Sequence, residues 1–182
     1  MVLVIIPRNQ FVEEELFPIL NLLKEAGKQV VVLSPTGREA TGMKKEKFTP
    51  QGMLADWDKQ TRIRGKYAAV LVLGGKGAPK SLWPNDLLPQ ILTDHFRAGR
   101  VVGAIGLGLP LLARAGLLPG EAAAPEDPAV LEELDRAGIC RAPTKVFAHG
   151  KVLTAEGAEA AAEFARALLQ ILEENAAGMP ET

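Results

Sequence analysis

The chain has 182 residues, 47% of them hydrophobic, and a formal net charge of -1. This length suffices for one domain with a sizeable core, and we expect a single domain over residues 1–182. The balanced charge gives no general argument for a nucleic-acid or membrane-surface partner. The single cysteine excludes an internal disulfide framework and a cysteine-based zinc cluster, and it favours a reducing, cytoplasmic location.

No membrane partner is expected, because the opening MVLVIIPRNQ lacks a basic n-region and no apolar run is long enough to span a bilayer. Basic residues do gather between positions 44 and 66. They are Lys44, Lys45, Lys47, Lys59, Arg62, Arg64 and Lys66. Since no interleaved aromatic residues or binding motif accompany them, they are interpreted as a solvated face and not as a nucleic-acid site.

Four short apolar runs, rich in branched side chains and without polar alternation, predict strands buried on both faces. They are VLVII at 2–6, VVVLS at 30–34, AAVLVL at 68–73 and VVGAI at 101–105. Helical patterns lie between these runs, and this alternation predicts a parallel sheet with right-handed crossovers. Ligands of such sheets bind beyond the carboxyl ends of the strands.

The first predicted helix has one apolar face, made of Val12, Leu16, Ile19, Leu20 and Leu23. Gly27 is expected to end this helix. Pro18 interrupts the pattern, so the regular helix is expected either to begin only near Glu15 or to bend at the proline. Residues 40–66 then break the alternation and are interpreted as a small hairpin with Gly42 and Gly52 at its turns.

The last third of the chain completes the pattern. Residues 117–128 are interpreted as a loop rich in proline and alanine, followed by a short helix at about 128–137. The run KVFAHGKVLT predicts a hairpin that turns at His149 and Gly150. The final helix has an apolar face of Ala161, Phe164, Ala165, Leu168, Ile171 and Leu172.

The segment AIGLGLPLLARAGLLPG, which includes the fourth predicted strand's end, resembles the nucleophile elbow of the ThiJ/PfpI superfamily. That superfamily includes the parkinsonism-associated deglycase and the intracellular protease PfpI, and its members typically read Ala-Ile-Cys-His-Gly there. Three further segments are similar in the same order: FVEEELFPILNLLKEAGKQVVVLSP, YAAVLVLGGKGAP and HGKVLTAEGAEAAAEFARALLQIL. The resemblance implies a flavodoxin-like α/β fold, shared with class I glutamine amidotransferases, with helices on both faces of a mostly parallel sheet plus small hairpins.

Several residues depart from the superfamily's pattern. Gly106 stands in place of the elbow cysteine, and Leu107 in place of the histidine that follows it. Glu15 matches the acidic residue that the superfamily places beside the cysteine thiolate, whereas Val12 stands where some members carry a second glutamate. The segment EAAAPEDP replaces a threonine or histidine pair found near the site in many members. Nucleophilic catalysis needs a thiolate, hydroxyl or amine, which neither glycine nor leucine supplies.

The other reactive residues suggest no alternative site. Cys140 is interpreted as a small buried hydrophobe, His95 as a solvent-facing residue of the helix before the fourth strand, and His149 as a turn residue. GLGLPL begins like the dinucleotide fingerprint G-x-G-x-x-G, but Leu111 is too large for its third glycine position. We therefore expect no cofactor and no metal site.

A glycine at the elbow has a conformational explanation. The resemblance implies that the elbow residue is held at a positive φ, which costs a non-glycine residue on the order of 1–3 kcal/mol, whereas glycine adopts it without steric penalty. We expect a positive φ at Gly106 and a small cleft walled by Glu15, Gly74, Gly75 and Leu107. Free N–H groups at Gly106 and at Gly74–Gly75 could hold a small carboxylate or phosphate. Ionised Glu15 would repel such an anion, but Glu15 kept protonated by burial would not.

Three hypotheses for function remain. The first is a ThiJ/PfpI-like domain without cysteine chemistry that binds a small molecule or anion or interacts with another protein. The second is an enzyme of the glyoxalase, deglycase or hydrolase type that uses Glu15 and turns over a small carbonyl compound. The third is a structural homo-oligomer without a ligand. The resemblance implies a homodimer or larger homo-oligomer in each case.

Overall fold

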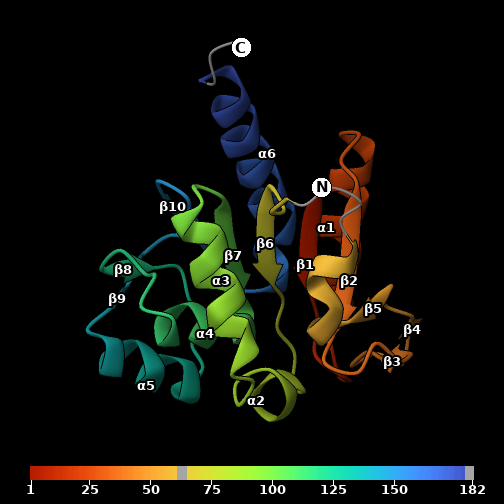
Figure 1. The fold of residues 1–182 in the computed structure, drawn as a ribbon. Coiled ribbons are helices and arrows are strands. Elements are labelled where there is room, and N and C mark those ends of the chain that lie inside the picture. The colour runs from red at the N-terminus through yellow and green to blue at the C-terminus, as the bar shows by residue number, and fades with distance from the viewer. Residues whose placement is uncertain (61–64, 179–182) are drawn as a thin grey trace.

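The structure is a computed structural model that describes residues 1–60 and 65–178. Within this part of the chain, a seven-stranded sheet has the order β10-β11-β7-β6-β1-β2-β5 (Figure 1). Its strands are β1 Val2–Ile5, β2 Val30–Ser34, β5 Gly52–Met53, β6 Ala69–Val72, β7 Val101–Ile105, β10 Val146–His149 and β11 Val152–Ala155.

The sheet is parallel except at its β10 edge, where β10 and β11 pair as an antiparallel hairpin. The strands β2-β1-β6-β7-β11 reproduce the 2-1-3-4-5 order of flavodoxin-like sheets. The four predicted apolar runs are all strands of this sheet, and the predicted hairpin turns at Gly150, which has a φ of +59°. The predicted fold class is therefore confirmed.

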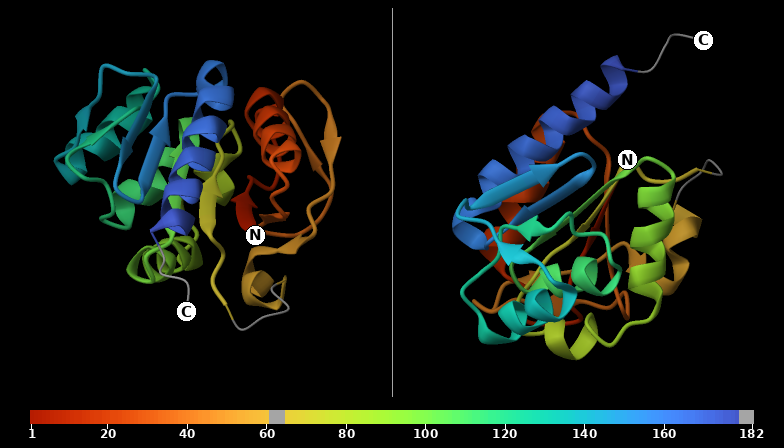
Figure 2. Two further views of the ribbon diagram at one scale, coloured as in Figure 1. Left: turned by 90° about the horizontal axis from the view of Figure 1, so that it is seen from above. Right: turned by 90° about the vertical axis from the view of Figure 1, so that its left-hand side faces the viewer.

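Helices cover both faces of the sheet (Figure 2). They are α1 Glu13–Glu25, α2 Ala78–Ser81, α3 Leu87–Arg97, α4 Leu109–Arg114, α5 Pro128–Ala137 and α6 Ala161–Ala177. Helices α1 and α6 pack together on one face, whereas α3, α4 and α5 contribute to the apolar cluster on the other. Short 3-10 turns occur at η1 Leu54–Gln60, η2 Gly106–Gly108 and η3 Ala158–Ala160.

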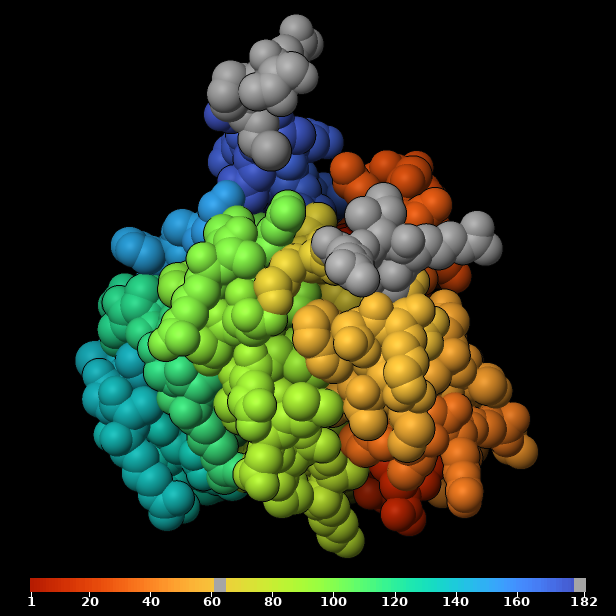
Figure 3. Space-filling view, in the orientation of Figure 1, coloured from red at the N-terminus to blue at the C-terminus, as the bar shows by residue number. Residues whose placement is uncertain are grey.

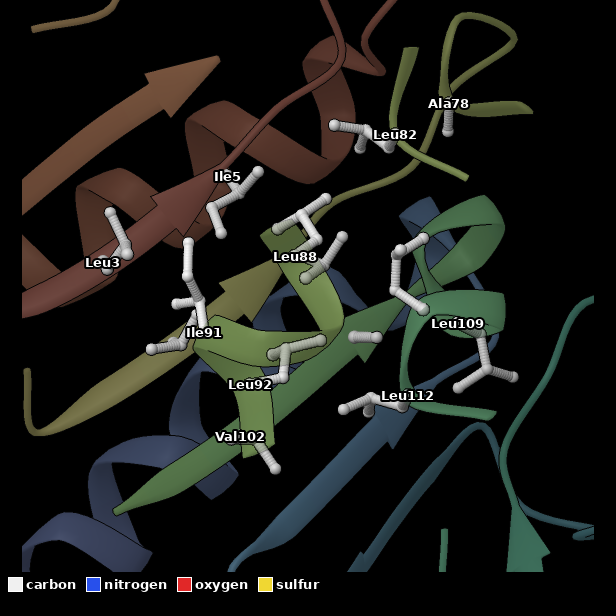
Figure 4. Packing of buried hydrophobic residues seen from close by; sticks show 14 of the residues in the cluster. Leu3, Ile5, Ala78, Leu82, Leu88, Ile91, Leu92, Val102, Leu109 and Leu112 are labelled. Carbon is white, nitrogen blue, oxygen red and sulfur yellow. The ribbon is translucent and has the colours of Figure 1, made fainter. Parts of the chain in front are cut away.

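Each central strand supplies side chains to both faces, because successive residues of a strand point in opposite directions. In β1, Leu3 and Ile5 join the cluster under α3, where Leu88 and Leu92 pack (Figure 4). Val4 of the same strand joins the cluster under α1 and α6. The two buried faces explain why these strands lack polar alternation in the sequence.

Helix α1 begins at Glu13, two residues before the predicted start, and continues through Pro18 to Glu25. Glu14 in its first turn favours this start, because a carboxylate lies favourably at the positive end of a helix dipole. The prediction of a start only near Glu15 was therefore wrong. Gly27 follows the helix with a φ of +72° and ends it as predicted.

The segment after β2 contains one predicted turn and one unexpected strand. Strands β3 Ala40–Thr41 and β4 Lys47–Phe48 form a hairpin, with Gly42 in its connecting turn. The prediction of a second turn at Gly52 was wrong, since Gly52 begins β5, which pairs in parallel with β2. The predicted loop at 117–128 likewise contains β8 Glu121–Ala122, which pairs with β9 Cys140–Arg141.

Candidate functional site

The candidate site lies at the carboxyl edge of the sheet, where the segments that follow three neighbouring strands meet. Glu15 is in the first turn of α1, which follows β1. Gly74 follows β6, and Gly106 directly follows β7. Strands β1 and β6 are neighbours although α1 and β2 separate them in sequence, so this is the switch point at which flavodoxin-like sheets bind ligands.

Glu15 is buried at this edge, and the residue is only 3% exposed. Its Oε2 accepts a hydrogen bond from the Gly74 backbone N–H at 2.8 Å. The pKa of Glu15 is raised to about 8, mainly by burial; the Gly74 hydrogen bond opposes this rise, and the nearby charge of Glu14 adds to it. Glu15 is therefore mostly a neutral acid at pH 7, with one O–H group to donate.

Gly106 has a φ of +59°, which confirms the predicted left-handed elbow. A Cβ at this position would lie 2.6 Å from Glu15 Oε1, which is closer than real Cβ contacts come. The Glu15 carboxyl therefore extends into the space toward which an elbow side chain would project.

The glycines around the elbow allow backbone segments to approach one another closely. A Cβ at Gly74 would lie 2.5 Å from the Leu107 backbone nitrogen. One at Gly75, whose φ is +129°, would collide with the Gln10 carbonyl oxygen, and one at Gly108 with the carbonyl of Val72. Gly74, Gly75 and Gly106 are all buried, whereas Leu107 is partly exposed. The five predicted site residues therefore do come together, in tight backbone packing.

Trp83 is a part of the site that the sequence analysis missed. Its indole N–H donates a 2.7 Å hydrogen bond to the Leu107 carbonyl in the elbow turn. The Arg114 guanidinium lies 5.5 Å from the Trp83 ring centre, donates to the Trp83 carbonyl at 2.6 Å and pairs with Glu133 at 2.8 Å. These contacts hold Trp83 in place and thereby position the Leu107 carbonyl of the elbow turn. No motif at Trp83 indicates this role, which depends on the packing of α2 against the elbow turn.

Two predictions about other reactive residues were wrong. His95 is fully buried instead of solvent-facing, because Trp57 and Tyr67 pack against its ring. Its Nδ1 lies 2.7 Å from the Ile91 carbonyl, and its Nε2 accepts the Tyr67 N–H at 3.3 Å. Cys140 is exposed instead of buried, because β9 lies at the surface. His149 is exposed at the end of β10, beside the predicted turn.

Many of the basic residues between 44 and 66 form ion pairs with acidic neighbours. The pairs are Lys44–Glu14, Lys47–Glu39, Lys59–Asp56 and Lys66–Asp94. Arg62 and Arg64 lie outside the described residues. Paired cations are partly neutralised, which agrees with a solvated face.

The described part of the chain contains neither a metal-binding cluster nor a membrane-spanning helix. In residues 1–60 and 65–178, no three His, Cys, Asp or Glu side chains are grouped so that they could hold a metal ion. Over the same ranges, no helix has both the length and the apolar character needed to cross a bilayer.

The sequence profile of the DJ-1/PfpI family matches residues 1–171. The chain belongs to the DJ-1/PfpI family. An uncharacterized protein of Methanocaldococcus jannaschii is 33% identical over 178 residues, which cover 96% of this chain and 83% of that protein.

Solved structures of the DJ-1/PfpI family share the fold over nearly the whole chain. A ThiJ/PfpI domain protein from Brachyspira murdochii superposes with a TM-score of 0.86 at 21% identity, covering 95% of this chain and 96% of that one. Drosophila melanogaster DJ-1beta gives 0.76 at 23% identity, with 95% and 89% covered. Oxidized Toxoplasma gondii DJ-1 gives 0.77 at 23% identity, with 97% and 96% covered. Within this family, the present chain carries Gly106 and Leu107 at the elbow.

Proposed function

We propose that this DJ-1/PfpI-family chain is a binding or interaction protein that performs no cysteine-dependent chemistry. The observation that carries the proposal is the contact of Glu15 with Gly106, in which a neutral carboxyl takes the space of an elbow side chain. Gly106 supplies no nucleophile, and Leu107 cannot carry a proton. The chain's one cysteine, Cys140, is exposed in β9, a strand outside the three strand ends that form the elbow.

The ligand class that we assign to the elbow is a small carboxylate, phosphate or carbonyl compound. Neutral Glu15 can donate a hydrogen bond to an oxygen of any of these and does not repel an anion. Amide chemical shifts of Gly74 and Gly106 on addition of acetate, inorganic phosphate or dihydroxyacetone test this assignment. Unchanged shifts with all three compounds would leave protein interaction as the remaining form of the proposal.

The lack of cysteine chemistry is tested with methylglyoxal and peptide substrates, using the purified protein and Cys140→Ser. We expect no turnover from either protein. Turnover by the wild type that disappears in Cys140→Ser would contradict the proposal, because Cys140 would then be the nucleophile. Adding the double substitution Gly106→Cys and Leu107→His to the Cys140→Ser background tests whether the elbow can regain a reactive thiol, measured by iodoacetamide labelling.

A second candidate function is proton transfer by Glu15 to or from a small carbonyl compound. The pKa of about 8 favours it, because acids and bases that work near neutral pH have such values. Its signature would be methylglyoxal turnover that is retained in Cys140→Ser, lost in Glu15→Gln, and dependent on a group with a pKa near 8.

The proposal places the chain in the cytoplasm as a homodimer. Light scattering on the purified protein measures the oligomeric state. A stable oligomer whose elbow amides respond to none of the three test compounds would favour the third hypothesis, a structural assembly without a ligand.

A further inference from the structure

A second candidate site is a cavity of about 380 Å³ at the amino edge of the sheet, at the opposite end of the strands from Glu15. Its polar lining is Arg100, Lys151 and Asn175, and its apolar lining includes Ala68, Leu172 and Ala176. The end of α3, the β10–β11 turn and α6 converge there, at the top of the molecule in Figure 3. The volume lies within the range of ligand sites, roughly 300–1,000 Å³.

Arg100 and Lys151 occupy equivalent places in the fold. Each directly precedes a parallel strand, Arg100 before β7 and Lys151 before β11, and these strands are neighbours paired with Val102 opposite Val152. Each also follows a glycine of positive φ, which turns the chain into the strand. The Arg100 N–H donates to the His95 carbonyl at 2.9 Å, and the Lys151 carbonyl accepts from Val102 at 2.8 Å. The backbone of both residues is therefore held in place, and both side chains extend from the same edge of the cavity.

Within residues 1–60 and 65–178, neither cation has an acidic partner and no carboxylate lines the cavity. The Lys151 ammonium donates to the neutral Asn175 side-chain oxygen instead. Two other cavities differ in this respect, because Arg114 in one is paired with Glu133 and Arg141 in the other with Glu126. The cavity at the amino edge therefore combines an apolar wall with two cations that form no ion pair with a described residue.

We propose that this cavity binds a small phosphate monoester with a compact apolar body. The Arg100 guanidinium offers paired donors that match phosphate oxygens, and the Lys151 ammonium adds a second positive charge. Asn175 orients that ammonium from α6. The apolar body of the ligand contacts Leu172 and the alanines. This site is separate from the elbow and does not depend on the function proposed there.

The test uses phenyl phosphate, titrated by calorimetry and by amide chemical shifts. We expect saturable binding that weakens with added salt, with shifts at Arg100, Lys151 and Leu172 and none at Gly74 or Gly106. Arg100→Met and Lys151→Met should each weaken binding about tenfold, because each removes a hydrogen bond to a charged group. Arg38→Met, which removes an exposed arginine outside the cavity, is the matched control and should bind as the wild type does.

Two further ligands define the chemistry of the site. Inorganic phosphate should bind more weakly than phenyl phosphate if the apolar wall contributes, and phenol should not bind because it lacks the charge. Equal affinity of the wild type, Arg100→Met and Lys151→Met for phenyl phosphate would overturn the proposal. So would an absence of binding by a folded wild type at millimolar concentration, in which case the two cations serve only to offset the negative ends of the nearby helices.

Discussion

Glu15 Oε1 lies 2.6 Å from the point that a Cβ at Gly106 would occupy, while Oε2 of the same carboxyl accepts a hydrogen bond from the Gly74 N–H. The lack of a side chain at Gly106 and the burial of Glu15 therefore depend on each other. A side chain at residue 106 would displace the Glu15 carboxyl and disturb its hydrogen bond with the Gly74 N–H. In this chain the elbow is a hydrogen-bonded junction between α1, β6 and β7.

Gly106→Ala is expected to lower the free energy of unfolding by roughly 1–3 kcal/mol, since its Cβ meets both a positive φ and the Glu15 carboxyl. Denaturant midpoints measure the change. Gly150→Ala is a matched control, because Gly150 has the same φ of +59° but nothing within 4 Å of the added Cβ. Gly106→Ala should therefore be the more damaging of the two. Equal losses of unfolding free energy in the two variants would mean that the Glu15 carboxyl moves away from the added methyl group without destabilising the protein.

Glu15→Gln is expected to remove a pH dependence of stability. The folded-state pKa is about 8 and the ordinary value is 4.5, so the unfolded chain loses this proton first as the pH rises. The stability that Glu15 contributes is therefore complete below pH 4.5 and declines toward pH 8, by up to about 1.4 kcal/mol per pH unit. The variant should gain stability relative to the wild type between pH 5 and pH 8.

Urea unfolding at several pH values measures this difference, with Glu163→Gln as the control because Glu163 is exposed on α6. The control should follow the wild type at every pH. A Glu15→Gln profile parallel to that of the wild type would show that Glu15 is already ionised in the folded protein at neutral pH.

His95 is expected to make the protein sensitive to mild acid. Burial lowers the pKa of His95, and the positive charges of Lys66 and Arg100 lower it further. Both ring nitrogens are engaged with backbone groups, and the Nε2 that accepts from Tyr67 cannot also carry a proton. The unfolded chain therefore binds the proton more readily, so this contribution to stability is complete above about pH 6.5 and is lost as the pH falls.

Melting temperatures at pH 7.5 and pH 5 should show a smaller acid loss for His95→Gln than for the wild type. His149 is the chain's other histidine and is exposed, so His149→Gln is the control and should keep the wild-type acid loss. If His149→Gln removed the acid sensitivity and His95→Gln did not, the assignment to the buried ring would be wrong.

Trp83→Phe is expected to cost about 1 kcal/mol or more, because the Leu107 carbonyl loses its indole donor. The change should also shift the amide resonances of Gly106 and Gly108 in the elbow turn. A stability loss without any shift of these resonances would mean that Trp83 supports α2 alone and does not fix the elbow.

The sequence patterns predict the central sheet well, because strands buried on both faces need continuous apolar runs such as VVVLS and VVGAI. The left-handed backbone at Gly106 could also be predicted, since the resemblance identifies the elbow. The positions of His95 and Cys140 could not, because both depend on tertiary packing. His95 is buried by Trp57 and Tyr67, which come from a polar segment without helical or strand periodicity.

The approach of Glu15 to Gly74 could be expected only through the resemblance, since 59 positions separate them. Strand β5 was missed for a different reason. It has only two residues, which is too short to show a period-2 pattern. Its parallel pairing with β2 arises because the chain brings this segment beside β2 in the folded protein.

The short β5 also limits how copies of this chain can associate. An outer strand with two residues has too few free backbone donors and acceptors to template a further strand, which is a common protection against edge-to-edge aggregation. The opposite edge is β10, whose four residues form the outer strand of a hairpin. An assembly that continued the seven-stranded sheet across two copies would therefore join them at β10, whereas other modes of association would use helices, loops or the small β3–β4 and β8–β9 sheets.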